Sequence, residues 1–275
     1  MAFFLGIDGG GTGCRAALAD EAGRILGQGQ GGPANINTDV DGAAASIMQA
    51  TAQAVQGSGA DPRDLVAVMG LAGGTMTAAT ERLAALLPFA RMRIVNDAVT
   101  AARGALGADD GILAALGTGS VFAVQRGGDL RQVGGRGFLM GDEGSGAVMG
   151  RALLSLAMRA GDGFAPMTPL LHDLLAEFDG IEGIIGFGNT ARPVDFARLA
   201  PRIVADDDPA ARQVFDGAVA DVRHILTVLQ GDRPLPVVFV GGLGPAFAAR
   251  LTDWPQRPAQ GSGVDGALLL ARQMA

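Results

Sequence analysis

The positions of apolar residues predict that short strands alternate with amphipathic helices in the first half of this 275-residue chain. Apolar segments of strand length occur at residues 3–7, 14–19, 25–31, 64–74 and 91–95. Between Gly42 and Val55 the apolar residues instead recur every three or four positions, as they do on one face of a helix. Further helices are predicted at 78–87 and from Ala98 onward. Such alternation is typical of an α/β fold.

The opening pattern around Gly6 returns at Gly111. FLGIDGGGTGCRAALADEAGRILGQG and GILAALGTGSVFAVQRGGDLRQVGG each contain an apolar strand, a glycine turn with a Thr-Gly pair, a second strand, a polar hairpin turn and a third strand. The two copies lie too far apart for a solenoid repeat, so they indicate a duplicated domain. We therefore predict two lobes, residues 1–105 and 106–275, with a last helix that can pack back on the first lobe.

The second half of the chain is predicted to be mostly helical. Its helical segments lie at residues 145–160, 170–177, 193–205 and 210–230. A buried strand follows within 235–247, where a double glycine precedes a helix start, and the chain closes with a last helix in 261–275.

Composition narrows the class of protein. With 48% hydrophobic and 18% charged residues the chain is typical of a compact globular protein. A net charge of −7 argues against nucleic acid as a partner. The single cysteine, Cys14, excludes an intrachain disulfide framework and a Cys-rich metal site within one chain. No apolar run reaches the roughly 18 to 20 residues of a membrane span, and the N-terminal run lacks the basic flank of a signal peptide, so we expect a cytoplasmic protein.

The glycine turn Asp8–Gly13 is the first candidate binding site. It lacks both the G-x-G-x-x-G of a dinucleotide loop and the G-K-[ST] of a Walker A loop. A turn between two strands can present successive N–H groups and the Thr12 hydroxyl to a phosphate, while Asp8 can hold Mg²⁺ through water. The alternative is a glycine-rich hairpin without a ligand. The similar turn at Leu116–Ser120 favours a phosphate site that is contacted by both turns.

Three carboxylates, Asp97, Asp142 and Glu143, lie where strands or loops lead into predicted helices. Asp97 can be the N-cap of the helix that follows, or it can accept the proton of an alcohol during phosphoryl transfer. Asp142 and Glu143 can likewise favour a helix N-terminus, whereas Asp142 can also accept hydrogen bonds from a polyol. Adjacent residues diverge in direction, so this pair does not indicate a two-carboxylate glycosidase.

The glycines Gly241, Gly242 and Gly244 follow the predicted buried strand, at the place where open α/β sheets bind ligands. They can let an adenine ring lie against the backbone, or they can be purely structural. His172 and His224 have no partner in the pattern and are interpreted as structural, so no zinc site is predicted.

Five stretches together resemble one known family. GIDGGGT, VNDAVTAARGA, LGTGS, GGRGFLMGDEGSGAVMGRALL and VFVGGLG occur in the order found in the BadF/BadG/BcrA/BcrD-type branch of the actin-like ATPase superfamily. Within that branch the chain is most similar to the N-acetylglucosamine and glucosamine kinases. The resemblance implies two lobes with a duplicated ribonuclease-H-like core, ATP and Mg²⁺ in the cleft between them, transfer of the γ-phosphate to the 6-hydroxyl of an amino sugar, and a homodimer.

The resemblance also implies a role for each matching residue. Asp97 would be the catalytic base and Asp8 the residue that holds Mg²⁺ through water. The other nucleotide contacts would be Gly10, Gly11, Thr12, Gly117, Thr118, Gly119, Gly241 and Gly242. The sugar contacts would be Asn35, Asp97, Gly135, Arg136 and Asp142. Arg136 replaces the tryptophan that the family commonly has, which puts recognition of an N-acetyl group in doubt and would suit an acidic or otherwise substituted sugar.

Two other functions within the superfamily remain as alternatives. One is an ATPase activator that passes an electron from an iron-sulfur cluster, but a cluster shared by a dimer needs two thiolates per chain and only Cys14 is present. The other is a nucleotide-dependent sensor that phosphorylates nothing.

Overall fold

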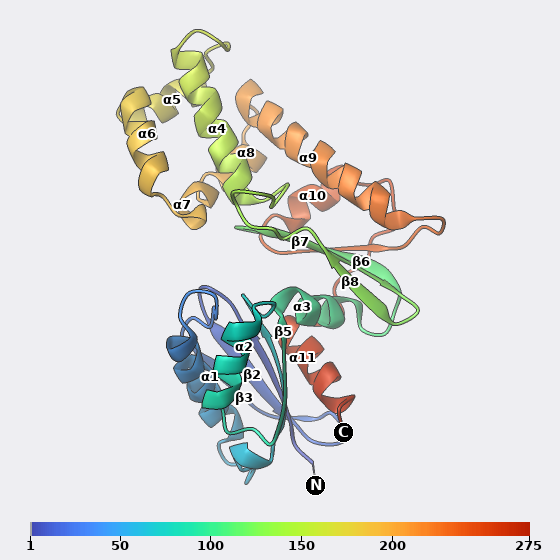
Figure 1. The fold of residues 1–275 in the computed structure, drawn as a ribbon. Helices are drawn as coiled ribbons and strands as arrows, with labels where there is room; N and C mark the ends of the chain where they lie inside the picture. The colour runs from blue at the N-terminus through green and yellow to red at the C-terminus, as the bar shows by residue number, and fades with distance from the viewer. Residues whose placement is uncertain (1) are drawn as a thin grey trace. The chain divides into compact units, whose positions relative to one another are not determined.

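The computed structural model describes residues 2–275, which fold into two compact units (Figure 1). The first unit contains residues 2–111, 125–132 and 258–275, and the second contains 112–124 and 133–257. Each unit is thus built from segments that are far apart in the sequence. The division into domains after residue 105 stays a prediction.

The first unit contains a five-stranded sheet in the order β3-β2-β1-β4-β5. Its strands are β1 (Phe4–Gly9), β2 (Cys14–Ala19), β3 (Ile25–Gly31), β4 (Val66–Leu71) and β5 (Arg91–Asn96). The first three strands are antiparallel neighbours, whereas β4 and β5 run parallel to β1. The glycine turn joins β1 to β2 and is closed by the Gly10 N–H, which donates to the Gly13 carbonyl at 2.9 Å.

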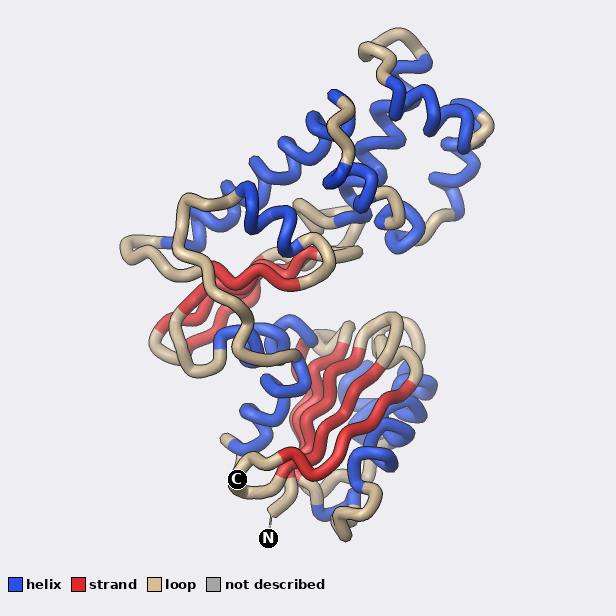
Figure 2. Tube along the Cα trace, turned by 180° about the vertical axis from the view of Figure 1, so that it is seen from behind, coloured by secondary structure: helices blue, strands red, loops and turns tan. Residues whose placement is uncertain are grey.

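Helices cover both faces of this sheet (Figures 1 and 2). Helices α1 (Val40–Val55) and α2 (Thr77–Leu86) pack on one face, and α3 (Asp97–Leu106) and α11 (Gly263–Arg272) pack on the other. A short 3₁₀ helix lies at Pro62–Asp64. Because successive side chains of a strand point to opposite faces, Leu5 and Ile7 join the core beneath α1 while Phe4 joins the core beneath α11.

Glycines bring the helices into backbone contact with their neighbours. A Cβ at Gly29 in β3 would lie 2.0 Å from the Ala50 carbonyl oxygen of α1. A Cβ at Gly266 in α11 would lie 1.9 Å from the Thr100 carbonyl oxygen of α3. Both distances are shorter than any ordinary nonbonded contact, so these positions admit only glycine without movement of the backbone.

The second unit contains a four-stranded sheet in the order β8-β7-β6-β9. Its strands are β6 (Gly111–Leu116), β7 (Ser120–Arg126), β8 (Asp129–Val133) and β9 (Val237–Val240), with β9 parallel to β6. The order repeats that of β3-β2-β1-β4 in the first unit. The predicted α/β fold with a duplicated core is therefore confirmed.

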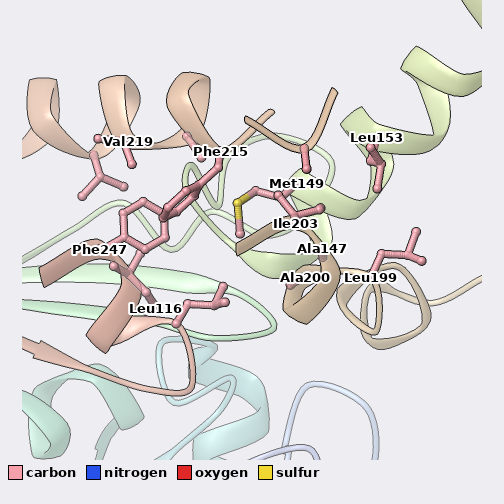
Figure 3. Packing of buried hydrophobic residues seen from close by; sticks show 14 of the residues in the cluster. Leu116, Ala147, Met149, Leu153, Leu199, Ala200, Ile203, Phe215, Val219 and Phe247 are labelled. Carbon is pink, nitrogen blue, oxygen red and sulfur yellow. The ribbon is translucent and has the colours of Figure 1, made fainter. Parts of the chain in front are cut away.

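Seven helices of the second unit complete its fold. They are α4 (Gly146–Gly161), α5 (Pro169–Glu177), α6 (Gly180–Thr190), α7 (Pro193–Ala197), α8 (Ala200–Ala205), α9 (Pro209–Gln230) and α10 (Gly244–Arg250). Figure 3 shows their core, in which the rings of Phe215 and Phe247 meet edge to face at 5.2 Å beside Leu116 and Met149. Among residues 2–275 no helix is long and apolar enough to cross a membrane.

One helix prediction in this unit is wrong, and one helix is missed. The segment 193–205 forms two short helices instead of one, because Pro201 lacks the N–H of a helix interior and stands in the first turn of α8. Helix α6 is not predicted, because GIEGIIGFGNT is rich in glycine. Tertiary packing stabilises it instead: Ile184 is buried, and the Phe187 ring contacts Phe178 and Phe196.

Candidate functional site

The glycine turn of the first unit borders a pocket of about 490 Å³. The pocket is lined by Asp8, Gly9, Gly10, Thr12, Gly13, Cys14, Arg15, Gln30, Gly31 and Asp97. The structure therefore brings together Asp8, Gly10, Thr12 and Asp97 from the predicted set. Gly10 and Gly11 face open space, since no heavy atom lies within 4 Å of the position a Cβ would take. A ligand can approach the backbone closely there.

Asp8 lies near the carboxyl end of β1, where its backbone is paired with Arg15 of β2 and with Gly70 of β4. Burial raises the pKa of its carboxyl group, and the negative charge of Asp97 raises it further. The Arg15 guanidinium opposes both effects. Asp8 is thus a half-buried carboxylate that faces a second carboxylate across one pocket, an arrangement typical of functional sites.

Asp97 is the first residue of α3, directly after β5. The N-cap is its neighbour Asn96, whose side-chain oxygen accepts the Ala98 N–H at 3.1 Å. Asp97 Oδ1 shares that donor at 2.9 Å. Burial raises the pKa of the Asp97 carboxyl group, and the Ala98 N–H opposes the shift. Because Asn96 caps the helix, Asp97 can face the pocket without leaving the helix end unsatisfied.

Several residues that line this pocket are not predicted from the sequence. One of them, Arg15, is the only cationic residue in the pocket lining. Arg15 is the one charged residue of β2 and is exposed. Its position opposite Asp8 follows from the hairpin register, which a strand-turn-strand pattern could have supplied. Cys14 also lines the pocket, but burial and the charge of Asp8 raise the pKa of its thiol to about 12.

Asn35 does not line the pocket. Its neighbour Ala34 is tied to the turn, since the Ala34 N–H donates to the Gly10 carbonyl at 2.9 Å. The Asn35 side-chain oxygen accepts the Asn37 N–H at 3.0 Å. In this structure the side chain of Asn35 therefore stabilises a local turn beside the glycine turn.

In the second unit the turn between β6 and β7, at residues 117–119, is hydrogen-bonded to the start of α4. The N–H groups of Gly146 and Ala147 donate to the carbonyls of Gly117 and Thr118 at 2.8 and 3.1 Å. The Ser120 hydroxyl donates to the Glu143 carbonyl at 2.8 Å. These bonds join the turn, the loop that precedes α4 and the helix itself into one element.

Asp142 lies at the centre of that element. Its backbone is in the left-handed region, with φ 59°, and its Oδ1 accepts the Gly137 N–H at 3.0 Å. Its Oδ2 would be 3.0 Å from a Cβ at Gly119, so the carboxylate lies against the turn that joins β6 to β7. Burial raises the pKa of the Asp142 carboxyl group; the hydrogen bond from the Gly137 N–H lowers it, and the charge of Glu143 raises it to a smaller extent.

The remaining predicted residues of the second unit lie around the same turn or on the loop before α4. A Cβ at Gly241 would be 2.3 Å from the Leu116 carbonyl oxygen, so Gly241 approaches the end of β6, whereas Gly242 faces open space. Thr118, Gly135 and Arg136 are exposed.

Metal binding by protein ligands alone is not indicated. Residues 2–275 contain no group of three or more His, Cys, Asp or Glu side chains that could hold an ion. A site with one or two carboxylates suits Mg²⁺, which keeps several waters and takes its other ligands from substrate phosphates. Asp8 and Asp97 fit that description.

The chain is similar in sequence to one family of ATPases and to two sugar kinases. The sequence profile of the BadF/BadG/BcrA/BcrD ATPase family matches residues 5–268. The glucosamine kinase GspK of Vibrio cholerae is 32% identical over 286 residues, which cover 98% of this chain and 96% of that protein. An N-acetylmuramic acid/N-acetylglucosamine kinase of Clostridium acetobutylicum is 28% identical over 182 residues, 64% of this chain and 60% of that protein.

A solved structure is similar along the whole chain. A Chromobacterium violaceum protein, proposed to be an N-acetylglucosamine kinase, superposes with a TM-score of 0.86 at 31% identity, covering 98% of this chain and 99% of its own. The profile match and the full-length relative together lead to one conclusion: the chain belongs to the BadF/BadG/BcrA/BcrD ATPase family.

Proposed function

We propose that this protein is an ATP-dependent kinase that transfers the γ-phosphate to the 6-hydroxyl of glucosamine or N-acetylglucosamine. The observation that carries the proposal is the pairing of Asp97 and Asp8 in one pocket at the glycine turn. Full-length similarity to a glucosamine kinase supports the choice of acceptor.

Asp97 would be the general base. Removing the proton of the attacking hydroxyl contributes roughly 10²- to 10⁴-fold to the rate. Burial raises the pKa of Asp97 above its usual acidic range, which makes the carboxylate a better proton acceptor.

Asp8 would hold Mg²⁺ through water. When bound, the ion neutralises charge on the phosphate oxygens of ATP. Phosphates would be held by Gly10, Gly11 and Thr12, whose turn opens on the pocket. The turn of the second unit would add contacts from Gly117, Thr118 and Gly119, and Gly241 and Gly242 would contact the adenosine.

The sugar would be held by Asn35, Asp142, Gly135, Arg136 and Asp97. Arg136 is exposed on the loop that Asp142 anchors. A guanidinium there favours a second acceptor with a carboxylate, and a relative that acts on N-acetylmuramic acid is of that class. Asn35 would have to give up its bond to the Asn37 N–H to bind a sugar hydroxyl through Oδ1.

The proposal extends to the state of the protein in the cell. We propose a cytoplasmic homodimer, since ATP is the phosphate donor and the family resemblance implies a dimer. Light scattering coupled to size exclusion measures the mass directly, and a mass near 27.7 kDa would contradict the dimer.

The proposed activity is tested by ADP release with ATP, Mg²⁺ and a panel of glucosamine, N-acetylglucosamine, N-acetylmuramic acid and glucose. We expect release that depends on an amino sugar and a product phosphorylated at the 6-hydroxyl. Asp232→Asn, which changes an exposed carboxylate far from the turn in sequence, is the control and should keep the wild-type rate. ADP release that no sugar stimulates would refute the kinase and favour an ATPase of another role.

A further inference from the structure

The C-terminal helix α11 begins directly against the Asp8 side chain. Gly263 is its first residue. A Cβ at Gly263 would lie 2.7 Å from both Cγ and Oδ1 of Asp8, and 2.9 Å from Oδ2. The φ of Gly263 lies outside the left-handed region, so an alanine can adopt its backbone conformation. The glycine is therefore required for space and not for its conformation.

Backbone contacts hold the start of helix α11 closely against its neighbours. A Cβ at Gly104 of α3 would be 1.7 Å from the Ser262 carbonyl oxygen, so the two helices already touch through their backbones. A Cβ at Gly6 of β1 would be 2.7 Å from the Val264 carbonyl oxygen, so the helix also packs closely on the strand that carries Asp8. The start of the helix is also fixed internally, because the Ser262 N–H donates to Asp265 Oδ2 at 2.7 Å.

Asp8, in contrast, has room to move. Asp8 lines the pocket of about 490 Å³, whereas no residue of α11 does. A methyl group at position 263 would therefore displace the carboxylate toward the pocket and leave the helix in place. The backbone of β1 at Asp8 is held by its pairing with β2 and β4, so the displacement is a side-chain rotation.

We propose that Gly263 is a positioning residue for the Asp8 carboxylate: by lacking a side chain, it lets Asp8 take the orientation in which it holds the water shell of Mg²⁺. The inference rests on the proposed function, which assigns Mg²⁺ to Asp8. It adds a residue from the opposite end of the chain that no sequence motif of the turn includes.

The consequence is a specific defect in Gly263→Ala. Groups that orient a metal ligand cost about 10- to 100-fold in metal affinity when they are changed. We expect the Mg²⁺ concentration that gives half-maximal kinase activity to rise at least about tenfold in this variant. The KM for the sugar should stay near the wild-type value. Gly188→Ala is the matched control, because that helical glycine faces open space and the variant should behave as wild type.

Two readouts do not depend on turnover. The first is the Mg²⁺ midpoint of the thermal shift in the presence of ADP, measured for wild type, Gly263→Ala and Asp8→Ala. The second is a double-mutant cycle on Tm: Gly263→Ala should lower Tm by several degrees in the wild type and change it much less in Asp8→Ala, where no carboxylate remains to clash.

The outcomes separate the contact from the function. Equal Tm shifts in both backgrounds would show that the methyl group meets something other than Asp8, and would overturn the proposal. A Mg²⁺ midpoint equal in Gly263→Ala and wild type, but raised in Asp8→Ala, would also overturn it. If Asp8→Ala itself leaves the midpoint unchanged, the assignment of Mg²⁺ to Asp8 fails and the positioning role fails with it. Absence of sugar-dependent ADP release from the wild type would refute the kinase alone.

Discussion

Substitution of Asp142 separates the structural work of this carboxylate from its proposed contact with the sugar. The side chain anchors the loop before α4 through the Gly137 N–H, and its backbone occupies the left-handed region. Alanine cannot accept the hydrogen bond and is strained in that conformation. Asparagine keeps an acceptor oxygen and tolerates the left-handed region, but it removes the charge.

The expected magnitudes follow from these two contributions. The hydrogen bond from the Gly137 N–H contributes about 0.5–1.5 kcal/mol, because Gly137 is exposed and water can replace the lost acceptor. The left-handed region costs alanine about 0.5–1 kcal/mol more than aspartate, whose short polar side chain tolerates it. Asp142→Ala should therefore lower the free energy of unfolding by about 1–2.5 kcal/mol. Asp142→Gly, which relieves the strain but not the lost bond, should be about 1 kcal/mol less destabilised than the alanine variant. Asp142→Asn should stay within about 1 kcal/mol of wild type.

Urea unfolding of the three variants measures the stabilities, and steady-state kinetics on Asp142→Asn measures the sugar contact. A hydrogen bond to a charged group is worth about 1.5–3 kcal/mol, so this variant should raise the KM for the sugar about tenfold or more while remaining folded. A loss below about 1 kcal/mol in Asp142→Ala would refute the structural reasoning. An unchanged KM in Asp142→Asn would refute the contact with the sugar.

Three further predictions concern the first unit. Gly29→Ala places a methyl group against the Ala50 carbonyl, with backbone on both sides, so urea unfolding should show a loss of at least about 1–3 kcal/mol. Folding raises the pKa of Asp97, so ionisation of this carboxyl group lowers the free energy of unfolding as pH rises above the unfolded-state pKa of about 3.9. In urea unfolding, Asp97→Asn should therefore be more stable than wild type at pH 7 and as stable as wild type below about pH 3.9. With a pKa of about 12, Cys14 should react with iodoacetamide at pH 8 roughly 1,000-fold more slowly in the native than in the urea-unfolded protein, and equal rates would contradict its burial.

The sequence predicts those parts of the fold that depend on local signals. The strands at 14–19 and 25–31 have the predicted bounds because a polar hairpin turn separates two strand-length segments. Helix α6 is missed because it is stabilised by the contacts of Phe187 with Phe178 and Phe196, both outside the helix, and not by helix propensity. The break before α8 could have been predicted, since Pro201 cannot donate within a helix.

Some residues of the site can be predicted from local sequence, whereas others require strand register or tertiary structure. Asp8, Thr12 and Asp97 are found from sequence because they stand at strand ends beside glycines, and the structure places them in one pocket. Arg15 requires the hairpin register, which sets it opposite Asp8. Gly263 requires tertiary structure, because only the packing of α11 on β1 and α3 brings the last helix to the first strand.

The central claim is that Asp97 accepts the proton of the sugar hydroxyl, and the rate of Asp97→Asn tests it most directly. The amide has the same shape, and Asn96 continues to cap α3, so fold and nucleotide affinity should be nearly unchanged. We predict that kcat with saturating glucosamine or N-acetylglucosamine falls by roughly 10²- to 10⁴-fold, with the Kd for ADP near the wild-type value. A variant that keeps more than about a tenth of the wild-type kcat would contradict the role of Asp97 as the base.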